Sequence, residues 1–255
     1  MSPAEIAALA ERLDQAARDA TATPQLETPI TLADAYAIQR ASIDRRLARG
    51  ERQVGIKMGF TSRAKMQQMG VSDMIWGRLT DAMQVEDGGE LALAHYVHPR
   101  VEPEIAFLLR RPLSGPVTLP QALAAVEAVA PALVVIDSRY RDFRFSLTDV
   151  VADNSSSSGF VLGPWGRPDQ DVSNLGLVMA FNGRPQAYGS TAAILGHPLR
   201  SLVAAARVVA EAGQTLQAGD IVLAGGATAA SPLHAGLHVS LEMERLGRCG
   251  FHVTA

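Results

Sequence analysis

The spacing of hydrophobic and polar positions changes near Gly50. Before it, residues 3–20 carry apolar side chains at helical spacing, which predicts an amphipathic helix. Thr31 is a suitable N-cap for a second helix over residues 32–48, and Gly50 suits the left-handed conformation that often ends a helix. The first part of the chain is therefore predicted to be helical.

Beyond Gly50 the apolar runs become short and strand-like, and turn signals such as Asn182-Gly183 separate several of them. Strands are predicted over residues 54–60, 83–85, 102–109, 133–136, 175–181, 221–224 and 239–243. Helices are predicted between them over residues 62–69, 120–130 and 199–212.

These elements predict a mixed, β-rich α/β fold. Its parts are a helical N-terminal segment over residues 1–50 and a catalytic domain over residues 51–255. The predicted strands do not alternate regularly with helices, so a barrel of eight βα units and a doubly wound sheet are both disfavoured.

Composition narrows the class of protein. Hydrophobic residues make up 47% of the chain, enough for a sizeable core, and a net charge of −3 offers no basic surface for nucleic acid. The single cysteine, Cys249, excludes a disulfide framework and is expected to be a small core residue. The N-terminus lacks a signal-peptide pattern and no run of 18 apolar residues occurs, so we expect a cytoplasmic protein with no membrane partner.

Two glutamates form the most informative polar pattern. Glu102 and Glu104 are two residues apart in a predicted strand, so they point to one face of it. Apolar neighbours indicate partial burial, where two like charges repel unless a cation or a proton lies between them. A divalent metal with oxygen ligands satisfies both carboxylates, and the alternative is two exposed glutamates on an edge strand.

Charged residues also stand at two other apolar stretches. Lys57 lies between Gly55 and Gly59; if it is buried it can serve as an acid, a base or an anion partner, and otherwise it is an exposed strand lysine. A further apolar run ends abruptly at Asp137 and Arg139. Either these two side chains form a structural contact with each other, or they have a catalytic role.

Two loops of small residues complete the candidate chemistry. Residues 151–159 include Ser156 and Ser157, which either offer hydroxyl and backbone N–H groups to a carboxylate or form a simple turn. Gly225 and Gly226 permit close backbone approach to a ligand, without the Gly-Lys-Ser/Thr of a P-loop. The six histidines lack zinc spacing, and no G-x-S-x-G elbow supports a Ser–His–Asp hydrolase.

Several short motifs follow one another in a distinctive order. They are KMGFTS (57–62), KMQQMGV (65–71), HPRVEPEI (98–105), IDSRY (136–140), VADN (151–154), LGHPL (195–199), AGD (218–220) and GG (225–226). In this order the chain resembles the 2-oxopent-4-enoate hydratase and 4-oxalocrotonate decarboxylase group of the fumarylacetoacetate hydrolase superfamily. The resemblance covers essentially the whole chain, and Lys57-Met58-Gly59, the place of Asp81 and the run 136–140 are more similar to the decarboxylase.

The resemblance implies a mixed β-roll fold and a magnesium or manganese ion, which Glu102 and Glu104 hold together with a third acid. That acid is expected at position 134, where this chain has Val134. A valine cannot ligate a metal, and two carboxylates with water hold a divalent ion less firmly than three. We therefore expect an easily stripped, two-carboxylate metal site that water and substrate, or another acid, complete.

The same resemblance implies metal-assisted decarboxylation of 2-oxohex-3-enedioate to 2-hydroxypenta-2,4-dienoate and carbon dioxide, in aromatic catabolism. The expected catalytic residues are Lys57, as charge partner or proton donor, and Asp81. The substrate carboxylates are expected at Ser156, Ser157, Gly225, Gly226 and Thr228.

Two alternatives stay open. One is hydration of 2-hydroxypenta-2,4-dienoate, and the other is a repurposed or metal-deficient paralogue that binds a ligand or a partner enzyme, which Val134 favours. In each case the expected ligand is a small 2-oxo acid. The resemblance also implies a homo-oligomer and association with a hydratase or decarboxylase partner.

Overall fold

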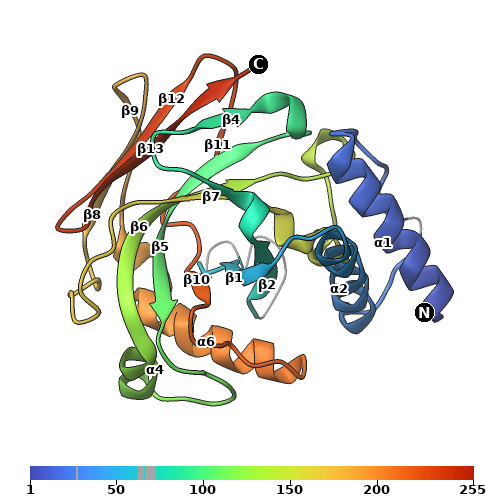
Figure 1. Ribbon diagram of the computed structural model, residues 1–255, viewed down its shortest axis with the longest axis horizontal. Helices are drawn as coiled ribbons and strands as arrows, with labels where there is room; N and C mark the ends of the chain where they lie inside the picture. The colour runs from blue at the N-terminus through green and yellow to red at the C-terminus, as the bar shows by residue number, and fades with distance from the viewer. Residues whose placement is uncertain (27, 63–65, 67–72) are drawn as a thin grey trace.

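The computed structural model describes residues 1–26, 28–62, 66 and 73–255, and its course is shown in Figure 1. The motif predicted over residues 65–71 and most of the helix predicted over residues 62–69 lie outside the described residues. The mixed, β-rich α/β class predicted from the sequence is confirmed.

Two helices form the N-terminal segment, α1 (Pro3–Arg18) and α2 (Leu32–Ala48). Each begins with a capping box, in which the N-cap hydroxyl and the acid three residues later satisfy each other's backbone N–H groups. The caps are Ser2 and Thr31, so the prediction of Thr31 as an N-cap is confirmed. Both helices pack their apolar faces into one cluster with Ile75 and Tyr140.

The strands of the described residues form two sheets. The larger sheet has the order β2 (Ile75–Thr80), β1 (Gln53–Gly59), β10 (Ile221–Leu223), β5 (Arg100–Leu109), β6 (Val126–Ile136), β7 (Ser157–Leu162) and β3 (Gln84–Val85), with β11 (Ser231–Pro232) also paired to β5. The second has the order β4 (Glu90–Ala92), β13 (Gly247–Thr254), β12 (His238–Met243), β8 (Gly176–Phe181) and β9 (Arg184–Ser190). Parallel pairs such as β1 with β10 occur beside antiparallel pairs such as β5 with β6, so the sheets are mixed.

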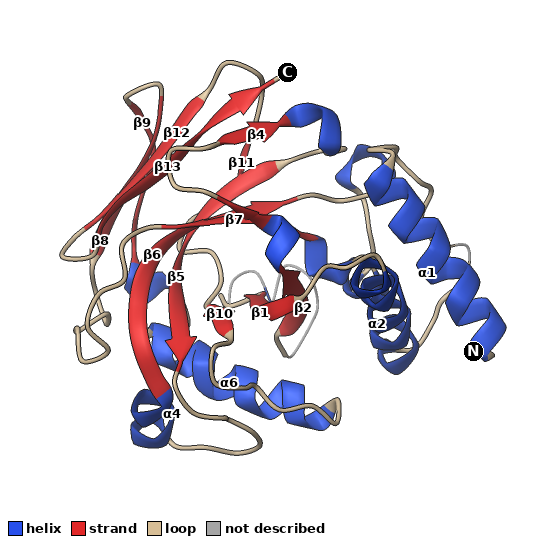
Figure 2. Cartoon of the chain, viewed as in Figure 1, coloured by secondary structure: helices blue, strands red, loops and turns tan. Residues whose placement is uncertain are grey.

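In the described residues after β1, the α-helices with established bounds are α4 (Leu119–Ala125), α5 (Leu147–Ala152) and α6 (Pro198–Glu211). Single 3₁₀ turns lie at η1 (Asp81–Met83), η2 (Leu93–His95), η3 (Arg141–Phe143), η4 (Asn154–Ser156) and η5 (Thr191–Ala193). Figure 2 shows α1 and α2 together on one side of the strands, with α4 and α6 on another.

The helix predicted over residues 120–130 is wrong in its second half. Helix α4 ends at Ala125, and residues 126–130 begin strand β6. This Ala-rich segment has good helix propensity, but its backbone pairs with β5, where Ala128 lies opposite Leu108 and Ala130 opposite Ala106. Ladder pairing and burial outweigh a local preference worth only tenths of a kcal/mol per residue.

Helix α6 is a core helix whose apolar face includes Leu202, Ala205 and Val209. The helical stretch Thr191–Glu211, with a mean hydropathy of 1.2, is long and apolar enough to pass a test for a membrane span, and half of it is buried against the rest of the protein. Core helices of soluble proteins pass the same test, so this stretch is weak evidence for a membrane. Cys249 is buried as predicted, and burial raises the pKa of its thiol to about 12.

Candidate active site

Glu102 and Glu104 lie on the central strand β5 and point to the same face of it. Both are buried, Glu102 at 6% and Glu104 at 0% exposure, so the alternative of two exposed glutamates on an edge strand is wrong. The β5–β6 register places Val134 directly opposite Glu102 and Ala132 opposite Glu104. Residues opposite each other in an antiparallel pair share a face, so the neighbouring strand offers two apolar side chains beside the carboxylates.

Lys57 comes to this site from β1 and is 3% exposed, so of the two alternatives the buried lysine is correct. Its Nζ atom lies 3.8 Å from Glu102 Oε1 and 3.5 Å from the carbonyl oxygen of Ser155. A buried ammonium is tolerated where opposite charge and polar oxygen surround it. In this structure the anion that partners Lys57 is therefore the Glu102 carboxylate.

Gly225 and Gly226, which follow β10, lie next to the two glutamates. The backbone N–H of Gly225 donates a hydrogen bond of 2.6 Å to Glu104 Oε2. Gly225 has φ +102°, and a Cβ there would lie 2.0 Å from Thr61 Oγ1, so no other residue fits without displacing the loop. A Cβ on Gly226 would lie 2.5 Å from Glu102 Oε2. In this structure the backbone of the pair lies close to the two glutamates, and the substrate-binding roles of Gly225 and Gly226 stay predictions.

The loop that faces Lys57 has an unusual backbone. Asn154, Ser155 and Ser156 have φ values of 50°, 51° and 58°, in the left-handed region that non-glycine residues rarely occupy. Two contacts hold it there: the Asn154 side chain bonds both backbone groups of Arg78, and Ser155 Oγ donates to the carbonyl of Trp76. This strained loop presents the Ser155 carbonyl to Lys57.

The serines expected to seat a carboxylate are buried, but their observed contacts are structural. The carbonyl of Ser156 accepts a hydrogen bond from the N–H of Asp137, and its own N–H donates to the carbonyl of Asp153. Ser157 Oγ lies against Gly77, the register partner of Lys57. The substrate-binding roles of Ser156 and Ser157 stay predictions, and so does that of Thr228, whose hydroxyl donates to the carbonyl of Ala229.

Asp81 lies apart from this group. It follows β2 and accepts hydrogen bonds from both the backbone N–H and the guanidinium of Arg52, at 2.9 and 3.0 Å. These bonds lower the pKa of its carboxyl. Arg52 precedes β1, whereas Lys57 pairs with Gly77 further along the ladder. The structure therefore does not bring Asp81 to Lys57, and its catalytic role stays a prediction.

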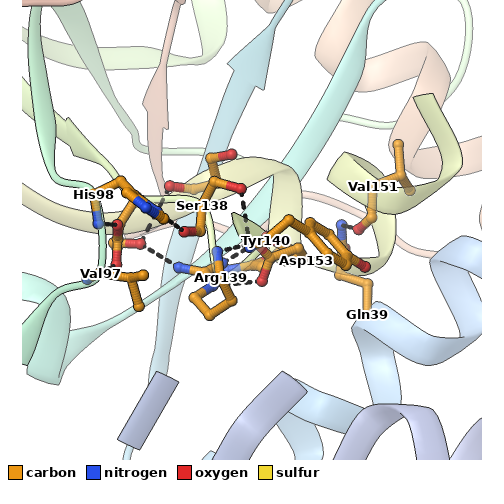
Figure 3. Close-up of polar contacts among 12 residues, drawn as sticks. Gln39, Val97, His98, Ser138, Arg139, Tyr140, Val151 and Asp153 are labelled. Carbon is orange, nitrogen blue, oxygen red and sulfur yellow. Dashed lines mark hydrogen bonds and ion pairs between the residues drawn. The ribbon is translucent and has the colours of Figure 1, made fainter. Parts of the chain in front are cut away.

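A second buried charge cluster, formed by Arg139 and Asp153, directly precedes the strained loop in sequence, and Figure 3 shows its polar contacts. The backbone N–H of Arg139 donates to Asp153 Oδ2 at 2.9 Å, and its guanidinium contacts Asp153 Oδ1, the carbonyl of Asp153 and Ser158 Oγ. Burial raises the pKa of Asp153 to about 6 against the lowering effect of Arg139.

The contact expected between Asp137 and Arg139 is replaced by two separate ones. Arg139 takes Asp153 as its carboxylate, while Asp137 accepts hydrogen bonds from the N–H groups of Val97 and His98 at 2.9 and 2.5 Å. The two side chains take different partners because β6 ends at Ile136, so residues 137–139 no longer follow the alternation of a strand. Both contacts fix the backbone between β6 and the loop at Lys57.

The donor set for a metal consists of Glu102 and Glu104. Within residues 1–26, 28–62, 66 and 73–255 the protein has no cluster of three His, Cys, Asp or Glu side chains that would hold a metal ion. Val134, on the same face, contributes no donor. Magnesium is commonly held by one or two carboxylates together with water and substrate oxygens, so the two glutamates fit a partly open magnesium-type site.

A sequence profile of the fumarylacetoacetate (FAA) hydrolase C-terminal family matches residues 48–254. A 4-oxalocrotonate decarboxylase of Pseudomonas sp. is 61% identical over 252 residues, covering 98% of each chain. A 2-hydroxyhexa-2,4-dienoate hydratase of Comamonas testosteroni is 36% identical and covers 96% of each. Among solved structures, 4-oxalocrotonate decarboxylase from Pseudomonas putida G7, complexed with magnesium and adipate, superposes with a TM-score of 0.97 at 38% identity, over 99% of this chain and 98% of that one.

Proposed function

The chain belongs to the fumarylacetoacetate hydrolase family, and on that premise we propose that it is a lyase, a 4-oxalocrotonate decarboxylase. It converts 2-oxohex-3-enedioate into 2-hydroxypenta-2,4-dienoate and carbon dioxide. The observation that carries the proposal is the buried group of Lys57, Glu102 and Glu104. It stands in a chain that is similar over nearly its whole length to decarboxylases of this name.

The substrate explains why a cationic site is needed. 2-Oxohex-3-enedioate is a vinylogous 3-oxo acid, in which the bond between C5 and the C6 carboxylate breaks to release carbon dioxide. The electron pair forms a C4–C5 double bond, the C3–C4 double bond moves to C2–C3, and negative charge arrives on the C2 oxygen. Protonation of that oxygen gives the dienol product. The barrier therefore depends on positive charge placed beside the C2 oxygen.

Among the described residues, Lys57 places such charge in this buried group. Its ammonium is fixed between Glu102 and the Ser155 carbonyl, and it has hydrogen atoms to donate to a developing oxyanion. A divalent ion held by Glu102 and Glu104 would supply further positive charge as a Lewis acid. The Gly225 N–H keeps Glu104 oriented. Burial of all three side chains strengthens the electrostatic interactions within the group.

Assays of both products test the proposal. Purified protein is incubated with 2-oxohex-3-enedioate, with magnesium or with EDTA, and released carbon dioxide and 2-hydroxypenta-2,4-dienoate are measured. We expect both to form together, faster with magnesium. Absence of carbon dioxide in every condition would contradict the proposal. The hydratase alternative, supported by the 36% identical hydratase relative, is tested with 2-hydroxypenta-2,4-dienoate as substrate and 4-hydroxy-2-oxopentanoate as product.

We further propose that magnesium or manganese is the ion, that the protein acts in the cytoplasm, and that it assembles as a homo-oligomer able to associate with a hydratase. The absence of a donor at Val134 supports weaker metal binding than a three-acid site would give. Calorimetry with each ion tests the metal proposal, and a chain that binds neither ion would instead favour the metal-deficient paralogue.

Replacing Val134 with glutamate is expected to tighten manganese binding by about tenfold or more, since it adds a third carboxylate on the face that Glu102 occupies. The measurement is the dissociation constant from manganese EPR. Val134→Gln is the matched control because it has the same length without the charge, and its affinity should stay near that of the parent. Equal affinities for all three proteins would contradict the two-carboxylate site.

Replacing Gly226 with alanine is expected to lower turnover on the order of 10-fold to 100-fold, because its Cβ would push the Glu102 carboxylate from its place. The fold should persist, since the displaced atom is the end of a flexible side chain. Gly176→Ala is the control: its Cβ would meet Glu244 Oε2 at an ordinary 3.8 Å. Equal kcat values for the two variants would show that Gly226 does not position Glu102.

A further inference from the structure

A second pocket lies on the reverse face of strand β2. Side chains alternate along a strand, so Trp76 and Arg78 point away from the face on which Gly77 pairs with Lys57. They line a pocket of about 480 Å³ between β2, α2 and the end of α6. Tyr36 forms another wall, with its ring stacked 5.4 Å from that of Trp76.

Arg78 is the unusual group in this pocket. It is 4% exposed, and its guanidinium lies over the Trp76 ring at 4.6 Å. Its Nη1 donates to Gln39 Oε1 at 2.5 Å. The Gln39 amide nitrogen is already committed to the carbonyls of Trp76 and Val151, so its oxygen is fixed toward Arg78. Within the described part of the chain, no carboxylate oxygen lies within 4.0 Å of the Arg78 guanidinium.

The acids that line the pocket are engaged elsewhere. Asp73 and Glu211 both form ion pairs with Arg207, at 2.7 and 2.9 Å. Burial and the nearby charge of Arg40 lower the pKa of Arg78 to about 10, which still leaves it cationic at neutral pH. Gln39 and Trp76, its side-chain partners among the described residues, are both neutral. A buried guanidinium in such surroundings is unfavourable, and an anion would relieve it.

We propose that this pocket binds a small carboxylate with a flat apolar body. The carboxylate pairs with the Arg78 guanidinium, whose planar fork suits two parallel hydrogen bonds, and the body lies beside Tyr36 and Trp76. Asp73 and Glu211 also line the pocket, and their negative charges repel an anion. A ligand with a single negative charge is therefore favoured over a phosphate, which carries up to two. The site is separate from the Lys57 group because it lies on the other face of β2.

Tryptophan fluorescence gives a direct test. The chain has two tryptophans, Trp76 and the exposed Trp165, so Trp165→Phe leaves Trp76 as the reporter. This protein is titrated with benzoate, and separately with inorganic phosphate, in EDTA and again in magnesium. We expect a saturable change in Trp76 emission with benzoate in both conditions, at least tenfold weaker with phosphate. Absence of saturation with benzoate would overturn the proposal.

Variants of the pocket locate the binding. In the same background, Arg78→Gln should weaken benzoate binding at least tenfold, whereas Arg184→Gln, which alters an exposed arginine on β9 that does not line the pocket, should change it less than threefold. Arg78→Lys keeps the charge without the fork and should give an intermediate affinity. In the native sequence, benzoate should raise the melting temperature. Equal affinity in the parent and in the folded Arg78 variants would overturn the assignment to this pocket.

Discussion

Turnover of 2-oxohex-3-enedioate is expected to fall by about 10²–10⁴-fold when Lys57 is replaced with methionine. Methionine preserves much of the volume of the side chain but removes the ammonium that lies 3.8 Å from Glu102 and 3.5 Å from the Ser155 carbonyl. The proposed reaction then places an oxyanion beside two buried glutamates without this positive charge. The measurement is kcat and kcat/KM at saturating magnesium, with circular dichroism to verify folding.

Two companion variants separate charge from packing. Lys57→Arg keeps a cation in the same stretch and should retain more activity than Lys57→Met. The double variant Lys57→Met with Glu102→Gln removes both charges of the 3.8 Å pair, so it should regain stability lost in the single variant without regaining turnover. If Lys57→Met stays within threefold of the parent in kcat, Lys57 has no part in the chemistry.

The largest expected loss of stability follows removal of the Asp153 carboxylate. Asp153→Ala leaves Arg139 buried without its ion pair and should lower the free energy of unfolding by about 3–5 kcal/mol. For a domain of this size the melting temperature should fall by about 10 °C. The segment before the loop at Lys57 should loosen as well, because the Asp153 carboxylate also accepts the backbone N–H of Arg139. Thermal unfolding by circular dichroism measures the change.

An exposed pair of similar geometry is the control. Arg167 and Asp169 form a 2.8 Å ion pair on the surface, with side chains 82% and 64% exposed. Solvent screens such a pair, so Asp169→Ala should leave the melting temperature nearly unchanged. If both aspartate variants melt at the temperature of the parent protein, the buried Arg139 cluster does not stabilise the fold.

Features governed by neighbours in sequence were predictable. The helix ends at Thr31 and Gly50 depend on capping chemistry within a few residues, and both agree with α2. The common face of Glu102 and Glu104 follows from the two-residue period of a strand. The helix over 120–130 was wrong where pairing with β5 outweighed local propensity.

Other features had no local signal. Strands β2 and β7 were not predicted, because β2 is buried throughout and β7 begins with serines, so neither alternates clearly. The left-handed run at Asn154, Ser155 and Ser156 depends on bonds to Arg78 and Trp76, which are far away in the chain. The sequence indicates a small, polar loop here, but no local pattern distinguishes Asn154 or Ser155 from its other residues.

By itself the sequence determined the fold class, the acidic pair, the glycine pair and the family resemblance. These features depend on residue types and on short spacings between them, and both can be read from the sequence. Only the tertiary structure decided that Lys57 meets Glu102, that Gly225 binds Glu104, that Arg139 takes Asp153, and that Arg78 faces a pocket. Those partners come from different strands and loops, and the chain brings them together only when long-range strand pairing sets their register.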